Sequence, residues 1–326
     1  MIPRWSLSVV LILGLLDLAL FPLLISRLRQ AHFTQLIRDE GPSSHKVKEG
    51  TPTGGGIMLV INVAVVTIAY ICAGSRGPWS GLDTATLLFV AVNFLSGLID
   101  DLLKEAKHRN DGLLGYQKLL IQTVAAALFF LVSRSNVISV VCTTGGRVLV
   151  AGWSFYLVAM FYAVGMVNAF NLTDGLDGLL AKVSLPVFVV AVVASCVLPS
   201  GLSGFLPLAG LAFVLSFLWF NGTRASLFMG DTGSLALGAI FVAWIFGSGN
   251  ELSSLLLGGL FLVEAVSVIL QVLVFKLSRR KKRLFLMAPI HHHFEKLGWE
   301  EPKIVDRFFV VSALFAVAGA LAMSWK

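Results

Sequence analysis

Two adjacent aspartates, Asp100 and Asp101, close an apolar run and offer acid-base or metal chemistry. Neighbouring side chains on a helix point about 100° apart, so these two carboxylates would rarely share one ligand equally. One carboxylate can therefore bind a cation while the other does acid or base work. A solvated helix end is the alternative interpretation, although anions at a helix C-terminus oppose the macrodipole.

A second polar group lies between residues 168 and 178. Asn168 and Asn171 are three residues apart, and the same spacing separates Asp174 from Asp177. Residues at this spacing face the same side of a helix or turn, so each pair is expected to converge. The glycines between them allow close backbone approach to a ligand. Capping of the next helix by Asp174 is the alternative, and it leaves the other three residues unexplained.

Asp231 follows Gly230 and leads into another apolar run. It could serve as an N-cap. A carboxylate that faces two other acidic helix ends also suits a hard cation, and Mg²⁺ usually takes one or two carboxylates together with substrate phosphates. An all-oxygen site without cysteine fits Mg²⁺ better than zinc.

Three consecutive histidines, His291, His292 and His293, occupy a long polar loop. On a regular helix their imidazoles fan apart too widely for a metal triad, so zinc is the weaker interpretation. Hydrogen bonding to a pyrophosphate, or assistance to proton transfer, is more natural.

Other charged segments carry weaker signals. A loop with Lys46, Lys48 and the run Thr51-Pro52-Thr53-Gly54-Gly55-Gly56 feeds a predicted helix and could receive an anion. It is not a Walker A sequence, because Gly-Lys-Ser/Thr is missing. The basic block at 276–283 is typical of a topogenic, anionic-lipid-binding collar, and nucleic acid is not expected as a partner, since no aromatic residues interleave it. Asp17 and Glu264 lie inside apolar runs and must face protein or a cavity, with their roles left open.

These residues must be positioned by membrane helices. Of 326 residues, 57% are hydrophobic and 13% are charged, about half the usual charged fraction of a soluble domain. The sequence predicts an all-α polytopic membrane protein, one domain over 1–326, with about ten transmembrane helices. The predicted helices cover 5–26, 54–73, 82–99, 117–133, 152–170, 177–198, 204–220, 232–248, 254–277 and 305–325.

The distribution of Lys and Arg predicts the orientation. With both termini on the outer face, the outside holds only Arg4, Arg76, Arg134, Arg147 and Lys326 of the 25 basic residues. The cytoplasmic loops are then expected near 27–53, 100–116, 171–176, 221–231 and 278–304. The three cysteines are far apart and predict neither a thiolate metal site nor a disulfide framework.

The motifs together resemble the phospho-N-acetylmuramoyl-pentapeptide-transferases, a family within the polyprenyl-phosphate N-acetylhexosamine-1-phosphate transferase superfamily. The resemblance covers nearly the whole chain. The most discriminating stretch, Ala288 to Trp299, resembles this family rather than the N-acetylglucosamine-1-phosphate branch. Gly54 departs from the family pattern, in which a bulkier residue, usually Met, precedes the glycine pair. The remaining motifs that carry the resemblance are Lys48 to Thr53, Asp100-Asp101, Asn168 to Gly178 and Gly230 to Gly238.

The resemblance implies a Mg²⁺-dependent transfer from UDP-MurNAc-pentapeptide to undecaprenyl phosphate, giving lipid I and UMP. It also implies a multi-pass protein among the lipids of the bacterial inner membrane, with its active site on the cytoplasmic face; a homodimer is left open. The alternative donor is UDP-GlcNAc. A secondary transporter is less favoured, because its site should lie near the membrane midplane and because the chain shows no inverted repeat.

The resemblance also implies roles for individual residues. Asp231 is expected to bind the metal with Asp100, and Asp100 or Asp101 to deprotonate the lipid phosphate. That phosphate is already largely ionised near neutral pH, its second pKa being about 6, so direct attack stays an alternative. Lys118 is expected to hold phosphate, and His291 and His292 to meet the phosphates or the sugar. The expected substrate-binding residues are Lys48, Thr53, Asn168, Asn171, Asp174, Asp177, Phe228 (as a stacking surface), Gln271 and His293.

Overall fold

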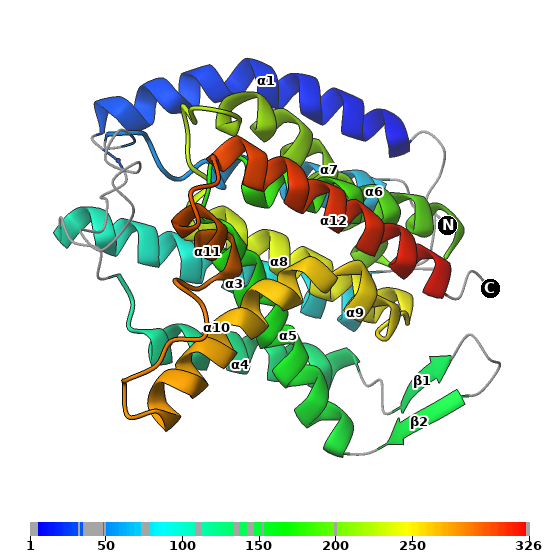
Figure 1. The fold of residues 1–326 in the computed structure, drawn as a ribbon. Helices are drawn as coiled ribbons and strands as arrows, with labels where there is room; N and C mark the ends of the chain where they lie inside the picture. Colours follow the sequence, from blue (N-terminus) through cyan, green and yellow to red (C-terminus); the bar gives the residue numbers. More distant parts are fainter. Residues whose placement is uncertain are drawn as a thin grey trace.

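The computed structural model describes residues 6–31, 33–34, 48, 50–72, 79–107, 112–133, 137–141, 147–151, 153–198 and 201–323. Within these ranges nine helices are long and apolar enough to cross a membrane. Figure 1 shows them packed as a helical bundle. They are α1 Ser6–Gln30, α3 Gly81–Lys107, α4 Gly115–Ser133, α5 Trp153–Thr173, α6 Leu179–Val197, α7 Leu202–Asn221, α8 Gly230–Ser248, α10 Gly259–Leu277 and α12 Glu301–Ala322.

The prediction of membrane-spanning helices is confirmed, except that one predicted span is divided into two helices. A tenth apolar helix, α2 Ile57–Cys72, is shorter at 16 residues. The segment predicted as one span over 254–277 is instead two helices, α9 Ser253–Leu257 and α10, which meet at Gly258. A Cβ at Gly258 would lie 2.6 Å from Cε of Met166 in α5, so the chain turns where it packs tightly against that helix.

The described part of the chain also contains a β-hairpin that was not predicted from the sequence. Strands β1 Val137–Val141 and β2 Arg147–Ala151 pair in antiparallel fashion, with Val137 opposite Ala151 and Val141 opposite Arg147. Both strands are rich in valine, whose β-branched side chain favours extended backbone. They lie in a segment expected to be an outer loop, so the all-helical prediction holds for the membrane-spanning part and misses this connection.

Two helices form the centre of the bundle. Of the 18 most apolar consecutive residues of each helix, 83% are buried in α7 and 78% in α8. In α1 and α10 only 22% of these residues are buried. The exposed apolar side chains of the peripheral helices suit contact with lipid tails. Inside, the Trp244 indole donates a hydrogen bond of 2.9 Å to the Ser195 hydroxyl, so even this large buried side chain has a polar partner.

At the start of α8, the backbones of α3 and of the segment just before α2 come into direct contact with the central helix. A Cβ at Gly97 of α3 would lie 2.2 Å from the main-chain oxygen of Asp231. Just before α2, a Cβ at Gly56 would lie 2.2 Å from the main-chain nitrogen of Gly233. Both distances are too short for any side chain. The two glycines therefore allow the backbones to touch, which brings the acidic segments together.

Substitution of Gly97 tests this contact. We expect Gly97→Ala to push α3 away from α8 and to lower the free energy of unfolding by about 1–3 kcal/mol, the usual cost of overpacking. Thermal unfolding of the purified protein measures the effect. Gly165→Ala in α5 is the matched control, because no atom lies within 4 Å of the added methyl group. Equal melting temperatures for the two variants would contradict the prediction.

Candidate active site

Three carboxylates converge where α3 meets the start of α8. Oxygen atoms of Asp100, Asp101 and Asp231 all lie within 4.8 Å of one another, the only such metal-compatible group of acidic, His or Cys residues in the described ranges. The side chains of Asp100 and Asp101 are almost fully buried, and that of Asp231 is 16% exposed. The cluster is thus reached from the Asp231 side.

The sequence had suggested that Asp100 and Asp101 end their helix, but in the structure they do not. Helix α3 continues to Lys107, because Leu102 to Lys107 are mostly good helix formers. Asp100 and Asp101 therefore belong to the last turns of α3, and the predicted loop at 100–116 is helical in its first part.

Asp101 caps α8 from a neighbouring helix. Its Oδ1 accepts the main-chain N–H of Asp231 at 3.1 Å, and its Oδ2 accepts the N–H and hydroxyl of Thr232 at 3.0 and 2.6 Å. The N-cap residue of α8, Met229, supplies no side-chain cap of its own. The suggested capping role of Asp231 is thus performed by Asp101, which leaves the Asp231 carboxylate free for other partners.

Two lysines balance the charge of the cluster. Lys118 Nζ lies 2.6 Å from Asp231 Oδ2 and 2.9 Å from Asp100 Oδ1. Lys104 Nζ lies 2.6 Å from Asp100 Oδ2 and 3.4 Å from Asp231 Oδ2. Lys118 was expected here from the sequence, but Lys104 was not among the predicted site residues. Its position four residues after Asp100 on one helix was the available signal.

The asparagines of α5 have different partners. Asn171 donates from Nδ2 to Asp231 Oδ1 at 3.0 Å and to the Ser234 hydroxyl at 2.9 Å, which ties the end of α5 to the carboxylate cluster. Asn168 instead donates to Gln122 Oε1 of α4 at 2.6 Å. The structure therefore places Asn171 at the cluster and Asn168 in a link between two helices.

A separate cavity of about 1050 Å³ holds other predicted substrate-binding residues. Lys48 Nζ lies there between Asp177 Oδ1, at 2.7 Å, and Glu301 Oε1, at 2.6 Å. The second oxygen of Asp177 accepts the Ala225 N–H at 3.0 Å. Glu301, in the first turn of α12, was not among the predicted site residues, since it falls in the segment expected to be the cytoplasmic loop at 278–304. The cavity is also lined by Thr51, Lys182, Arg224 and Asp306, among others.

Asp174 lies in the loop that joins α5 to α6, close enough to the cluster and to Asp177 of the cavity for their charges to act on it. Its pKa is raised to about 8, first by burial and then by the negative charges of Asp231, Asp101 and Asp177, while Lys104 opposes the shift. Near neutral pH this carboxyl group is therefore mainly protonated and can donate a hydrogen bond.

The three histidines point to three different partners. His291 is fully buried, and its Nδ1 lies 3.1 Å from Oε2 of Glu264. His292 Nδ1 lies 3.0 Å from Oε2 of Glu295, and His293 Nδ1 accepts the main-chain N–H of Leu286. They belong to the short helix α11 Ile290–Lys296. This divergence agrees with the view that they do not form one metal triad.

Two further predicted residues, Phe228 and Thr53, make backbone hydrogen bonds in or beside the glycine-rich loop. Phe228 donates its N–H to the carbonyl of Pro52 at 2.8 Å, and its own carbonyl accepts the N–H of Gly55, so the glycine-rich loop is paired with the entry to α8. Thr53 donates its N–H to the carbonyl of Phe33. Lys46, expected in the same loop, lies outside the described residues.

Gln271 of α10 anchors the loop that leads to the histidines. Its Oε1 accepts the main-chain N–H groups of Leu284 and Phe285, at 2.9 and 2.8 Å, and its Nε2 donates to the carbonyl of Phe285 at 2.9 Å. The side chain expected to bind nucleotide is thus fully used by the protein.

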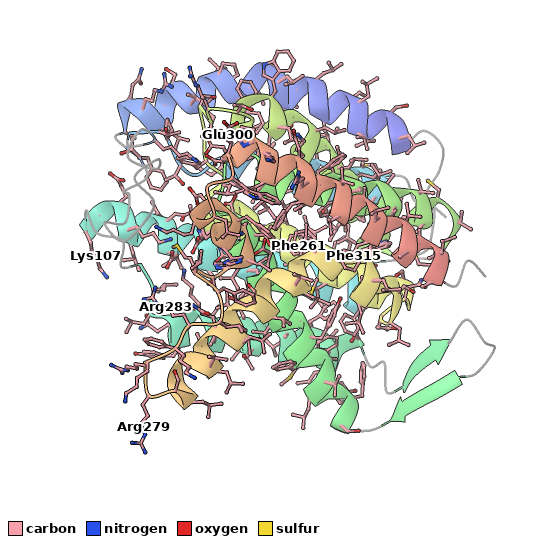
Figure 2. All side chains as sticks on the ribbon, in the orientation of Figure 1. Lys107, Phe261, Arg279, Arg283, Glu300 and Phe315 are labelled. Atoms are coloured by element: carbon pink, nitrogen blue, oxygen red, sulfur yellow. The ribbon has the colours of Figure 1, made fainter. Side chains whose placement is uncertain are left out.

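In Figure 2, Arg279 and Arg283 of the basic block point away from the bundle, near the end of the molecule that carries Lys107.

Comparison with known proteins first defines the class. Residues 84–248 match the family model for glycosyl transferase family 4. With its apolar helices and acidic cluster, the chain is a multi-pass membrane transferase.

Relatives along almost the whole chain make the assignment more specific. A phospho-N-acetylmuramoyl-pentapeptide-transferase of Oceanobacillus iheyensis is 40% identical over 309 residues, 94% of each chain. The proteins of the same name from Bacillus mycoides and Bacillus thuringiensis are 40% and 39% identical over 315 residues, 95% of each chain. The chain belongs to the phospho-N-acetylmuramoyl-pentapeptide-transferase family.

The shifted pKa of Asp174 predicts a pH-dependent stability. Between about pH 4 and pH 8 the folded protein keeps a proton on Asp174 that the unfolded chain has released. This stabilisation is complete below about pH 4 and is lost as the pH rises through about 8. In chelator-treated protein, we expect the melting temperature of wild type to fall more steeply than that of Asp174→Asn between about pH 6 and pH 9. The exposed residue Asp306, changed to Asn, is the control, and parallel curves for wild type and Asp174→Asn would refute the assignment.

Proposed function

We propose that the chain transfers phospho-MurNAc-pentapeptide from UDP-MurNAc-pentapeptide to undecaprenyl phosphate, with lipid I and UMP as products. The observation that carries this proposal is the cluster of Asp100, Asp101 and Asp231 with Lys104 and Lys118 at the ends of membrane helices. Such a place is open both to a water-soluble nucleotide sugar and to a phosphate on a lipid. The names of the relatives give the transferred group, phospho-N-acetylmuramoyl-pentapeptide, and the resemblance of the sequence motifs implies UDP as its carrier and undecaprenyl phosphate as the acceptor.

The proposed orientation puts the cluster on the cytoplasmic face of the inner membrane and both termini outside. Lys107, Arg279 and Arg283 lie at one end of the molecule in Figure 2, while the start of α1 and the end of α12 lie at the other end in Figure 1. Cationic residues accumulate in cytoplasmic loops. The basic end of the bundle is therefore the cytoplasmic end.

The residues of the cluster fit a Mg²⁺ ion. The donor set consists only of carboxylate oxygens, and an ion that keeps part of its water needs few protein ligands. Since Asp101 holds the start of α8 with both oxygens, Asp231 and Asp100 are the proposed ligands. When bound, Mg²⁺ neutralises the pyrophosphate and the charge that develops during phosphoryl transfer.

The side chains around the cluster hold the reacting phosphates in this proposal. Lys118 and Lys104 supply two positive charges beside the place where the acceptor phosphate must meet the donor. The acceptor phosphate is already largely ionised near neutral pH, because its second pKa is about 6, so it can attack without a base from the chain. The transfer then depends mainly on orientation and charge stabilisation.

The donor is proposed to enter through the cavity that holds Lys48 and Asp177. This cavity opens beside the loop of Asp174, and Asn171 at the end of α5 already contacts Asp231. A nucleotide in the cavity would thus have its pyrophosphate close to the cluster. Phe228 is the proposed stacking surface for uracil, since its backbone pairing with Pro52 fixes it beside the glycine-rich loop, whose Thr51 lines the cavity.

The lipid acceptor is proposed to approach along α4. Lys118 lies near the cluster in the first turn of α4, and beyond it the exposed side chains of the helix are apolar. A polyprenyl chain can lie against such a surface while its phosphate reaches the lysine. The exposed apolar residues of α4 beyond Lys118 are Leu119, Leu120, Val124, Leu128, Leu131 and Val132.

Purified protein with Mg²⁺ and undecaprenyl phosphate tests the reaction. We expect UDP-MurNAc-pentapeptide to give UMP and the corresponding lipid pyrophosphate, detected by mass spectrometry. UDP-GlcNAc is the competing donor. A preference for UDP-GlcNAc would replace the proposed substrate, and turnover of neither donor would refute the proposed reaction.

Asp231→Asn tests the site. We expect this change to lower the rate of Mg²⁺-dependent UMP release by about 10²-fold or more, because it removes one of the two proposed carboxylate ligands of the Mg²⁺ ion that neutralises the reacting phosphates. Glu105→Gln is the matched control, since Glu105 is also an acidic residue of the bundle end but lies outside the carboxylate cluster. Full activity of a correctly folded Asp231→Asn protein would refute the site assignment.

A further inference from the structure

Glu264 is a fully buried acid within the membrane-spanning helix α10. A carboxylate at this depth is costly unless it has a partner. Its Oε2 lies 3.1 Å from Nδ1 of His291, which is also fully buried, and the two atoms are within ion-pair distance although not ideally aligned for a hydrogen bond. A spanning helix thus reaches a histidine of the loop between α10 and α12.

The helix that carries Glu264 is itself firmly placed. Phe261, one turn earlier on the same face, stacks on Phe170 of α5 with ring centroids 3.9 Å apart and an interplanar angle of 14°. Figure 2 shows Phe261 in the interior, where α10 crosses the bundle. This packing directs Glu264 towards the protein rather than towards lipid.

The other ring nitrogen of His291 faces the donor loop. A Cβ on Gly175 would lie 2.3 Å from Nε2, so the imidazole is pressed against the main chain between α5 and α6. Nε2 has no hydrogen-bond partner among the described residues. The same loop carries Asp174 and Asp177, and it follows Asn171, which contacts Asp231. The free nitrogen is therefore next to the proposed path of the donor.

The second buried acid of the spanning helices serves a different purpose. Asp17 of α1 accepts hydrogen bonds from Asn62 of α2, at 2.8 Å, and from Ser216 of α7, at 2.9 Å. Both partners are neutral, and they lie in two other apolar helices of the bundle. Asp17 thus links three helices, whereas Glu264 contacts a titratable ring beside the site.

We propose that Glu264 is a positioning residue for His291, an inference that rests on the proposed transfer reaction. Its carboxylate accepts a hydrogen bond from Nδ1–H and fixes the orientation of the ring, so that Nε2 is the atom that donates to the diphosphate of the nucleotide sugar when the ring carries its second proton. The hydrogen bond at one imidazole nitrogen determines the state of the other, and a carboxylate partner is the usual way to set it. His292 and His293, which contact Glu295 and the Leu286 backbone, do not share this arrangement.

Kinetics of Glu264→Gln test the proposal. The glutamine keeps the size of the side chain but can turn a donor group towards Nδ1. We expect kcat to fall by about 10–100-fold, with a smaller change in KM for UDP-MurNAc-pentapeptide and a near-unchanged melting temperature. Asp17→Asn is the matched control, because it makes the same acid-to-amide change at a buried position of a spanning helix. It should lower stability and leave kcat within about twofold.

A double-mutant cycle separates positioning from general damage. In a His291→Asn background, Glu264→Gln should cause no further loss of kcat, because the residue through which Glu264 acts is gone. Losses that simply add, or wild-type kcat in Glu264→Gln, would overturn the proposal.

A spectroscopic measurement makes the test independent of turnover. In ¹⁵N-histidine-labelled protein, with the His291 signal assigned by its loss in His291→Asn, we expect a proton on Nδ1 and a clear shift of both ring nitrogens in Glu264→Gln but not in Asp17→Asn. A His291 ring with its only proton on Nε2 would overturn the pairing. If wild type turns over neither donor, the proposed reaction fails, while these spectra still decide whether Glu264 sets the state of His291.

Discussion

The contact on which the site depends is the cap that Asp101 of α3 provides for α8. The first N–H groups of a helix have no partner within it, and in a membrane protein an unsatisfied donor is especially costly. Asp101 satisfies those of Asp231 and Thr232 from across the interface. The same bond fixes Asp100, its neighbour, opposite Asp231. A requirement of backbone hydrogen bonding therefore also assembles the acidic cluster.

Two further conditions make this contact possible. The helices must approach until their backbones touch, which the glycines at 97 and 56 allow. The gathered negative charge must also be balanced, and Lys104 and Lys118 provide that balance from two helices. Because Lys118 contacts two of the carboxylates and Lys104 all three, removal of one lysine would change the surroundings of the whole cluster. The site thus behaves as a coupled unit in which single residues cannot be assigned independent energies.

Composition and local pattern were enough to predict the spanning helices and much of the acidic cluster. Ten apolar segments gave the helices, and the motifs pointed to Asp100, Asp101, Asp231, Lys118 and Asn171, which the structure brings together. They could not show which carboxylate caps α8, because that depends on how two distant helices dock. For the same reason Lys104 and Glu301 were not among the predicted site residues. Gln271 was expected to contact the nucleotide, but its side chain instead hydrogen-bonds the backbone of the loop at Leu284 and Phe285. The hairpin was missed because its strands, of five residues each, are far shorter than a membrane-spanning helix.

The two attachments of the histidine segment to α10 limit how it can move. Gln271 holds the backbone at Leu284 and Phe285, and Glu264 lies against His291 about two helical turns away along α10. A segment pinned at both ends to one rigid helix cannot swing open and shut as a hinged flap does. It forms a fixed wall, so selection between donors must come from the shape and charge already present. A change of specificity in this family member would then require altered wall residues rather than altered loop mobility.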